Sequence, residues 1–96
     1  MKFLKSSFFN QNYPNPFNPS TLIKFDIPNG AKNEKSNVKI VIYDVLGKQV
    51  AVLLDEKLSP GTYEVDWDAS DYPSGVYFYS LSSESVVQTR KMVLIK

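Results

Sequence analysis

Hydrophobic and polar residues alternate along most of this chain with the period of two that is typical of half-buried β-strands. The clearest example is Thr21 to Ile27, where Ile23, Phe25 and Ile27 share one face and Lys24 and Asp26 lie on the other. The same alternation predicts strands over residues 38–44, 48–54, 63–68, 76–82 and 86–95. No segment sustains the 3.6-residue period of an amphipathic helix, so the pattern predicts an all-β fold.

Turn-forming residues separate the predicted strands. Asp44–Lys48 is predicted to be a hairpin turn, in which the Asp44 carboxylate accepts backbone hydrogen bonds and Gly47 takes a positive φ angle. Ser59–Gly61 fits a type II turn, Pro73–Gly75 and Ser82–Ser85 are further turns, and residues 29–37 form a polar loop. Six to seven short strands with this turn spacing predict an immunoglobulin-like antiparallel β-sandwich.

The sandwich has to be held together by packing, because the chain has no cysteine for a disulfide between the sheets. We expect Trp67 at the centre of the core. In 76–82 we expect the tyrosine face to point inward, because it ends in leucine while the opposite face ends in serine. The expected core residues are Phe25, Ile40, Ile42, Trp67, Tyr77 and Tyr79.

A proline-rich segment, Asn12-Tyr-Pro-Asn-Pro-Phe-Asn-Pro-Ser-Thr21, precedes the first strand. Its three X-Pro bonds predict an extended arm over residues 12–20. We expect this arm to follow a sheet edge and to lay Tyr13 and Phe17 onto the sandwich. Pro16-Phe-Asn-Pro19 also satisfies the PxxP pattern of polyproline ligands. Residues 1–11 resemble a secretory leader only superficially, so we interpret them as the remnant of an upstream linker.

Composition excludes several classes of function. The 96 residues include 11 lysines and arginines and 10 acids without any basic stripe, which argues against nucleic-acid binding. No apolar run has the roughly 20 residues that a membrane-spanning helix needs. The absence of histidine and cysteine removes the usual zinc ligands, thiolate nucleophiles and histidine-based triads. We therefore expect no catalytic residues, no cofactor, no metal and no insertion into a membrane.

Two groups of charged residues have competing interpretations. Asp66 and Asp68 lie on one strand and, with Asp71, could form a weak calcium site. The alternative is a solvated outer face. Two carboxylates on one strand cannot flank a substrate as a glycosidase pair does. Likewise, the basic residues Arg90, Lys91 and Lys96 either contact a partner or protect an edge strand from unwanted pairing.

Six islands in this order carry a family resemblance: the proline-rich segment, Tyr43-Asp-Val-Leu-Gly-Lys48, Pro60-Gly61, Val65-Asp-Trp-Asp68, Ser74-Gly-Val-Tyr-Phe-Tyr79 and Thr89-Arg-Lys-Met-Val-Leu-Ile-Lys96. Over residues 10–96 the chain resembles the type A C-terminal sorting domain of the type IX (Por) secretion system. The resemblance implies an immunoglobulin-like domain of residues 12–96 fused to an upstream cargo. Such domains direct the cargo through the outer-membrane translocon to the cell surface or the medium. Many are then cleaved off as the cargo is attached to the surface.

The resemblance also implies which residues its partners, the translocon and cell-surface attachment proteins, recognise. They are Gly75, Val76, Tyr77, Lys91, Met92, Val93, Leu94, Ile95 and Lys96, with the arm residues Pro14, Pro16, Phe17 and Pro19. Gly75 and Tyr77 also have a purely structural reading, as a turn glycine and a core tyrosine. The turn Ser82–Ser85 departs from the family in lacking a glycine, and the loop 29–37 is longer than is common. Because cargo and export leader are missing, we expect the chain to be a fragment of a longer protein.

Two other functions remain open at this point. The arm also resembles that of the immunoglobulin-like domain of flagellar hook-capping proteins, which would make the chain a structural module. An accessory carbohydrate-binding module would instead need an exposed aromatic platform, for which Tyr72 and Phe78 are the candidates.

Overall fold

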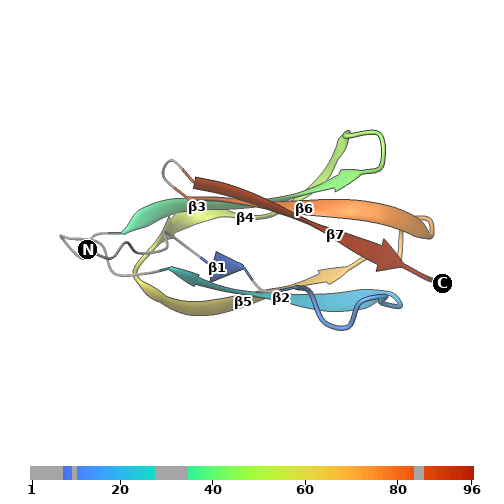
Figure 1. Ribbon diagram of the computed structural model, residues 1–96, viewed down its shortest axis with the longest axis horizontal. Coiled ribbons are helices and arrows are strands. Elements are labelled where there is room, and N and C mark those ends of the chain that lie inside the picture. Colours follow the sequence, from blue (N-terminus) through green and yellow to red (C-terminus); the bar gives the residue numbers. More distant parts are fainter. Residues whose placement is uncertain (1–7, 10, 28–34, 84–85) are drawn as a thin grey trace.

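The computed structural model describes residues 8–9, 11–27, 35–83 and 86–96, and these ranges form two packed antiparallel sheets (Figure 1). They contain strands but no helix, which confirms the predicted all-β sandwich. The strands are β1 Phe8–Phe9, β2 Ser20–Ile27, β3 Ser36–Asp44, β4 Gln49–Leu58, β5 Gly61–Asp68, β6 Gly75–Ser83 and β7 Val86–Leu94. One sheet has the order β1-β2-β5 and the other the order β4-β3-β6-β7.

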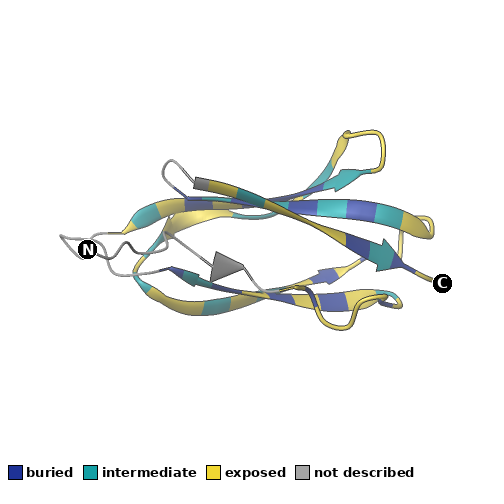
Figure 2. Cartoon of the chain, in the orientation of Figure 1, coloured by how far each residue is buried: buried dark blue, intermediate teal, exposed yellow. Residues whose placement is uncertain are grey.

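The alternation along the strands places one side of each sheet in the core (Figure 2). On β2, Ile23, Phe25 and Ile27 are buried, as the sequence predicts, and Thr21 is buried with them. On β3, Val41 is buried as well as Ile40 and Ile42, which fits the central position of this strand between β4 and β6. On β6, Tyr77, Tyr79 and Leu81 point inward, which confirms the choice of the tyrosine face.

The hairpin between β3 and β4 also forms as predicted. The Asp44 carboxylate accepts hydrogen bonds of 2.9 Å from the backbone N–H groups of both Leu46 and Lys48. The turn is closed by backbone bonds from Asp44 N to Lys48 O and from Gly47 N to Asp44 O. Gly47 has a φ of +86°, a conformation that side chains with a Cβ atom resist.

Several boundaries differ from the prediction. β4 runs four residues beyond the predicted end at Leu54, because its pairing with β3 continues to Leu58. Ser36 and Asn37 belong to β3 and not to the predicted loop, whose residues 29–34 lie outside the described ranges. Ser83 likewise extends β6 by one residue beyond the predicted end at Ser82, while 84–85 lie outside the description. The last strand ends at Leu94, one residue earlier than predicted.

The turn before β5 is not of type II. Gly61 has a φ of +153°, whereas the third residue of a type II turn has a φ of about +80°. The reason lies in the topology: Ser59 and Pro60 carry the chain from the four-stranded to the three-stranded sheet, so β4 and β5 are not partners in a hairpin. Gly61 pairs with Ile27 as the first residue of β5.

Candidate functional site

The proline-rich arm bridges the two sheets. Tyr13 forms an antiparallel bridge with Leu22 of β2, and Phe17 forms a parallel bridge with Leu94 of β7. Phe17 N donates to Val93 O and Ile95 N donates to Phe17 O, both at 2.9 Å. The arm is therefore tied to the middle strand β2 of one sheet and to the edge strand β7 of the other. It runs through bends at 14–16 and 18–19 and is not extended as predicted.

Only one of the two aromatic residues of the arm enters the core. Phe17 is 1% exposed, as expected, whereas Tyr13 is 77% exposed and the prediction for it is wrong. Asn12 points inward, and Tyr13 therefore points outward, because successive residues with a strand-like backbone point to opposite sides. The burial of Phe17 also argues against the PxxP interpretation, because the arm is already bound to its own sandwich.

Asn12 fixes the start of the arm through buried hydrogen bonds. Its backbone N–H donates to the Tyr79 hydroxyl at 2.7 Å, and its side-chain Nδ2 donates to Thr21 Oγ1 at 2.9 Å. The neighbouring Gln11 side chain donates to Lys91 O on β7 at 2.9 Å. The sequence reasoning did not single out Asn12 or Gln11. The signal in the sequence that could have indicated their role is the pair of side-chain amides just before the proline-rich segment.

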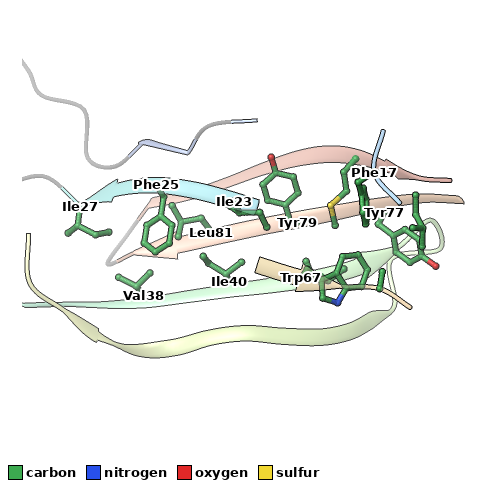
Figure 3. Close-up of a cluster of buried hydrophobic side chains, with 14 residues drawn as sticks. Phe17, Ile23, Phe25, Ile27, Val38, Ile40, Trp67, Tyr77, Tyr79 and Leu81 are labelled. Carbon is green, nitrogen blue, oxygen red and sulfur yellow. The ribbon is translucent and has the colours of Figure 1, made fainter. Parts of the chain in front are cut away.

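An aromatic cluster lies beneath the arm. Trp67 of β5 has ring centroids of Phe17, Tyr72 and Tyr77 within 5.8, 5.3 and 5.4 Å. The Tyr77 hydroxyl donates to Pro73 O at 2.7 Å, which orients the ring at the start of β6. Trp67 is buried as predicted, but it belongs to this cluster near one end of the sandwich, while Ile23, Ile40 and Tyr79 lie nearer the middle (Figure 3).

The two islands at the heart of the resemblance are direct neighbours in the four-stranded sheet. In the register of β6 and β7, Gly75 is opposite Leu94, Val76 is opposite Val93, and Tyr77 is opposite Met92. The arm joins the same place through the bridge between Phe17 and Leu94. We call this end of the sandwich, where the arm meets Gly75–Tyr77 and Lys91–Lys96, the arm end.

The sequence-predicted site residues fall into two groups by burial. Those that face the core are Phe17, Tyr77, Met92 and Leu94. Those that solvent reaches are Pro14, Pro16, Gly75, Lys91, Ile95 and Lys96, with Val76, Val93 and Pro19 half-buried. Only the second group can touch another molecule while the domain is folded.

The backbone conformation at Gly75 favours glycine. Its φ is +154°, which residues with a side chain rarely adopt, although a Cβ atom there would meet nothing within 4 Å. The constraint is therefore conformational and not steric.

The electrostatics of the arm end are set by hydrogen bonds and by burial. Lys96 Nζ donates to Ser70 O at 2.5 Å, and Lys96 N donates to Ser74 Oγ at 3.1 Å. Hydrogen bonds from the side chain and the backbone N–H of Ser70 lower the pKa of the Asp68 carboxyl, and the charge of Lys96 adds to this. Burial raises the pKa of the Tyr77 and Tyr79 hydroxyls.

The calcium hypothesis gains no support from the described residues. Asp66, Asp68 and Asp71 are all exposed, and within 8–9, 11–27, 35–83 and 86–96 no three carboxylates gather in a metal-binding arrangement. The Asp68 carboxylate instead accepts hydrogen bonds from Ser70.

The aromatic platform of a carbohydrate-binding module is also contradicted. Tyr72 packs against Trp67 and Tyr77 on the inner side, and its hydroxyl donates to Val50 O at 3.1 Å. Phe78 follows the inward-facing Tyr77 on β6 and therefore lies on the opposite side of the sheet. The two rings cannot form one platform.

Comparison with known proteins agrees with this architecture. The chain is similar in fold to the sensor domain of the anti-sigma factor RsgI4 in Pseudobacteroides cellulosolvens, with a TM-score of 0.59 and 13% sequence identity. The similarity covers 93% of this chain and 94% of that one, and it shows the fold alone. No curated protein sequence matches.

A match of protein-family profiles is more specific. Residues 11–96 match the family described as the secretion system C-terminal sorting domain, which is a sorting-signal family and not a catalytic one. In the described ranges no helix is long and apolar enough to cross a membrane. The chain therefore belongs to the secretion system C-terminal sorting domain family, and it is a signal by which the type IX system carries a fused cargo across the outer membrane to the cell surface or the extracellular space.

Proposed function

We propose that the arm end is the part of this sorting signal that the type IX translocon contacts. The observation that carries the proposal is the pairing of Gly75–Tyr77 with Met92–Leu94, since it joins two distant segments into one surface. The bridge from Phe17 to Leu94 adds the arm to that surface.

Within the arm end, burial assigns two different roles. The exposed side chains of Lys91, Ile95 and Lys96 and the half-buried Val76 and Val93 contact the translocon. The buried residues Phe17, Tyr77, Met92 and Leu94 act by holding this surface in shape. Recognition in this view needs a folded domain, because the contacting residues come from two strands that only the sheet brings together.

The organisation of the longer protein follows from the same proposal. Residues 1–11, of which Phe8–Phe9 pair with β2, connect the cargo to a sorting domain that spans 12–96. After transport the domain is removed, and cell-surface attachment proteins take over the cargo. Membership of the sorting family and the exposure of residue 11 support this sequence of events.

An export assay tests the role of the arm end. The chain is fused behind a reporter that folds in the periplasm of a cell with a type IX system, and the reporter is measured in the medium and at the cell surface. Changing both Lys91 and Lys96 to Glu reverses the exposed charge of the arm end, and we expect export to fall about tenfold or more, as for loss of an interface hot spot.

The matched control is Lys57→Glu, an exposed charge reversal on β4 outside the arm end, and it should leave export unchanged. Equal export of the charge-reversed and unchanged fusions would refute the assignment of the arm end. Retention of the unchanged fusion in the periplasm would refute the sorting role itself.

A further inference from the structure

The outer face of the four-stranded sheet is apolar at the arm end. Tyr43 of β3 is opposite Phe78 of β6, and Val76 of β6 is opposite Val93 of β7. All four side chains are half-buried although none of the described strands covers them. We call these four residues the outer strip. Further along β6, the outward positions are Ser80 and Ser82, although Val41 and Val87 opposite them are apolar. The two aromatic side chains of this face, Tyr43 and Phe78, therefore distinguish its arm end.

The hairpin between β3 and β4 continues this apolar character away from the sandwich. The register between β3 and β4 skips Leu53 and Val50 of β4, so each of these two residues is a β-bulge. A β-bulge bends its strand and increases the twist of the strand. The hairpin accordingly rises off the sheet, away from β2 and β5 (Figure 1). At its tip, Val45 and Leu46 are 65% and 89% exposed.

The tip is held rigidly in this exposed position. The Asp44 carboxylate bonds the backbone N–H groups of Leu46 and Lys48, and two backbone bonds close the turn. A single exposed leucine is ordinary on a protein surface. Here, however, the rigid tip is separated from Tyr43 of the outer strip only by Asp44, so two exposed apolar side chains lie close to the strip along the chain.

The other sheet shows that this surface is not a general property of the fold. Apart from Leu22, the outward positions of its strands at 24, 64, 66 and 68 carry Lys24, Glu64, Asp66 and Asp68. Antiparallel sheets with one solvated face normally have such polar outer positions.

We propose that the outer strip and the hairpin tip form a docking surface for a protein that presents apolar side chains flanked by carboxylates. The proposal rests on the sorting role above, and it extends the translocon contact of the arm end from Val76 and Val93 to Tyr43, Phe78 and the hairpin tip. Complementary charge identifies the partner: exposed Lys91 is opposite Phe78, and exposed Lys48 flanks the tip. The nearby Asp44 carboxylate is turned into the hairpin.

A second copy of the chain fits this surface less well. In a two-fold dimer each outer strip would face itself, and Lys48 and Lys91 of one copy would approach the same lysines of the other. Repulsion between like charges disfavours that contact. Acidic groups on a different protein would instead attract Lys48 and Lys91.

The test combines an export assay with photo-cross-linking, both with the full chain fused to a periplasmic reporter in a type IX-competent cell. Leu46→Asp places a negative charge where it repels carboxylates of the partner. Because the Leu46 side chain is 89% exposed, we expect the variant to stay folded, and urea unfolding verifies this. We expect this variant to be exported about tenfold more slowly. The matched control Leu22→Asp, on the outer face of β2, should be exported at the unchanged rate.

A benzophenone amino acid at position 46 should form an adduct with a protein other than the chain itself, and the same probe at position 22 should not. Adducts only with lipid or with a second copy, or no adduct, would overturn the proposal. So would equal export of Leu46→Asp and the unchanged fusion. If the unchanged fusion itself stays in the periplasm, the sorting role fails, and the docking proposal fails with it.

Discussion

The two ends of the sandwich are closed in different ways. At the arm end, Phe17, Trp67 and Tyr77 form an aromatic cluster, and backbone bonds from the arm reach the last strand. At the other end, Phe25 lies beside Ile27 and Val38 (Figure 3) and stacks on Tyr63 with ring centroids 5.6 Å apart, without a connection from the arm. An open polar groove lined by Asn37, Lys39, Val38, Asp55, Ser82 and Ser83 borders that end. The difference indicates that specific side-chain and backbone contacts are concentrated where we place recognition.

The sharpest way to break this comparison is to remove a ring from the arm end. Phe17→Ala should lower the free energy of unfolding by about 3–5 kcal/mol, because it deletes a fully buried ring from the cluster with Trp67. Trp67→Ala should have an effect of the same size. Urea unfolding followed by circular dichroism measures both.

At the other end, Ile27→Val deletes only one methylene and should lower the free energy of unfolding by about 0.5–1.5 kcal/mol, which sets the scale of a small core change. A loss below about 1 kcal/mol for Phe17→Ala would mean that the arm is not part of the core. The contribution of the arm to the core at the arm end would then be refuted.

A smaller change tests the polar link between the arm and the core. Tyr79→Phe leaves the buried N–H of Asn12 without its acceptor, so we expect a loss of about 1–3 kcal/mol. The matched change at the other end is Tyr63→Phe, whose hydroxyl donates to Ser59 O in an exposed position. That variant should stay within about 0.5 kcal/mol of the unchanged chain. Equal losses of stability in the two variants would show that the buried hydrogen bond from Asn12 N to the Tyr79 hydroxyl contributes no more than the exposed one from Tyr63 to Ser59 O.

The smallest effect appears only in alkali. Burial raises the pKa of Tyr77 and Tyr79 above the unfolded value of about 10, so the folded state binds these protons more tightly. The stability that they contribute is complete below about pH 10 and is lost as the pH rises through the folded pKa values. Urea unfolding at a series of alkaline pH values should show this decline. The decline should be shallower in Tyr79→Phe, and an unchanged slope in that variant would contradict the role of burial.

The sequence predicted the core faces well, because burial on one side of a strand leaves a period of two in neighbouring residues. Ile23, Ile40 and Tyr79 were assigned inward from that period, and all are fully buried. The Asp44–Gly47 turn was equally predictable, since its hydrogen bonds are local.

What the sequence did not reveal depends on contacts between distant residues. The outward position of Tyr13 follows from Asn12 binding Tyr79, 67 residues further along the chain. The hairpin rises off the sheet because of the bulges in the register between β4 and β3. No local sequence pattern marks Leu53 and Val50 as bulge positions. The meeting of Gly75–Tyr77 with Met92–Leu94 became visible only with the strand pairing.

The parallel bridge between Phe17 and Leu94 has a mechanical consequence. The arm and β7 run in the same direction there, so tension between the cargo side and the far terminus pulls the two segments past each other lengthwise. The hydrogen bonds from Phe17 N and Ile95 N lie across that pull and share it. We expect the domain to resist traction until both bonds yield together, which a force-extension trace would record as one abrupt step and not as gradual peeling.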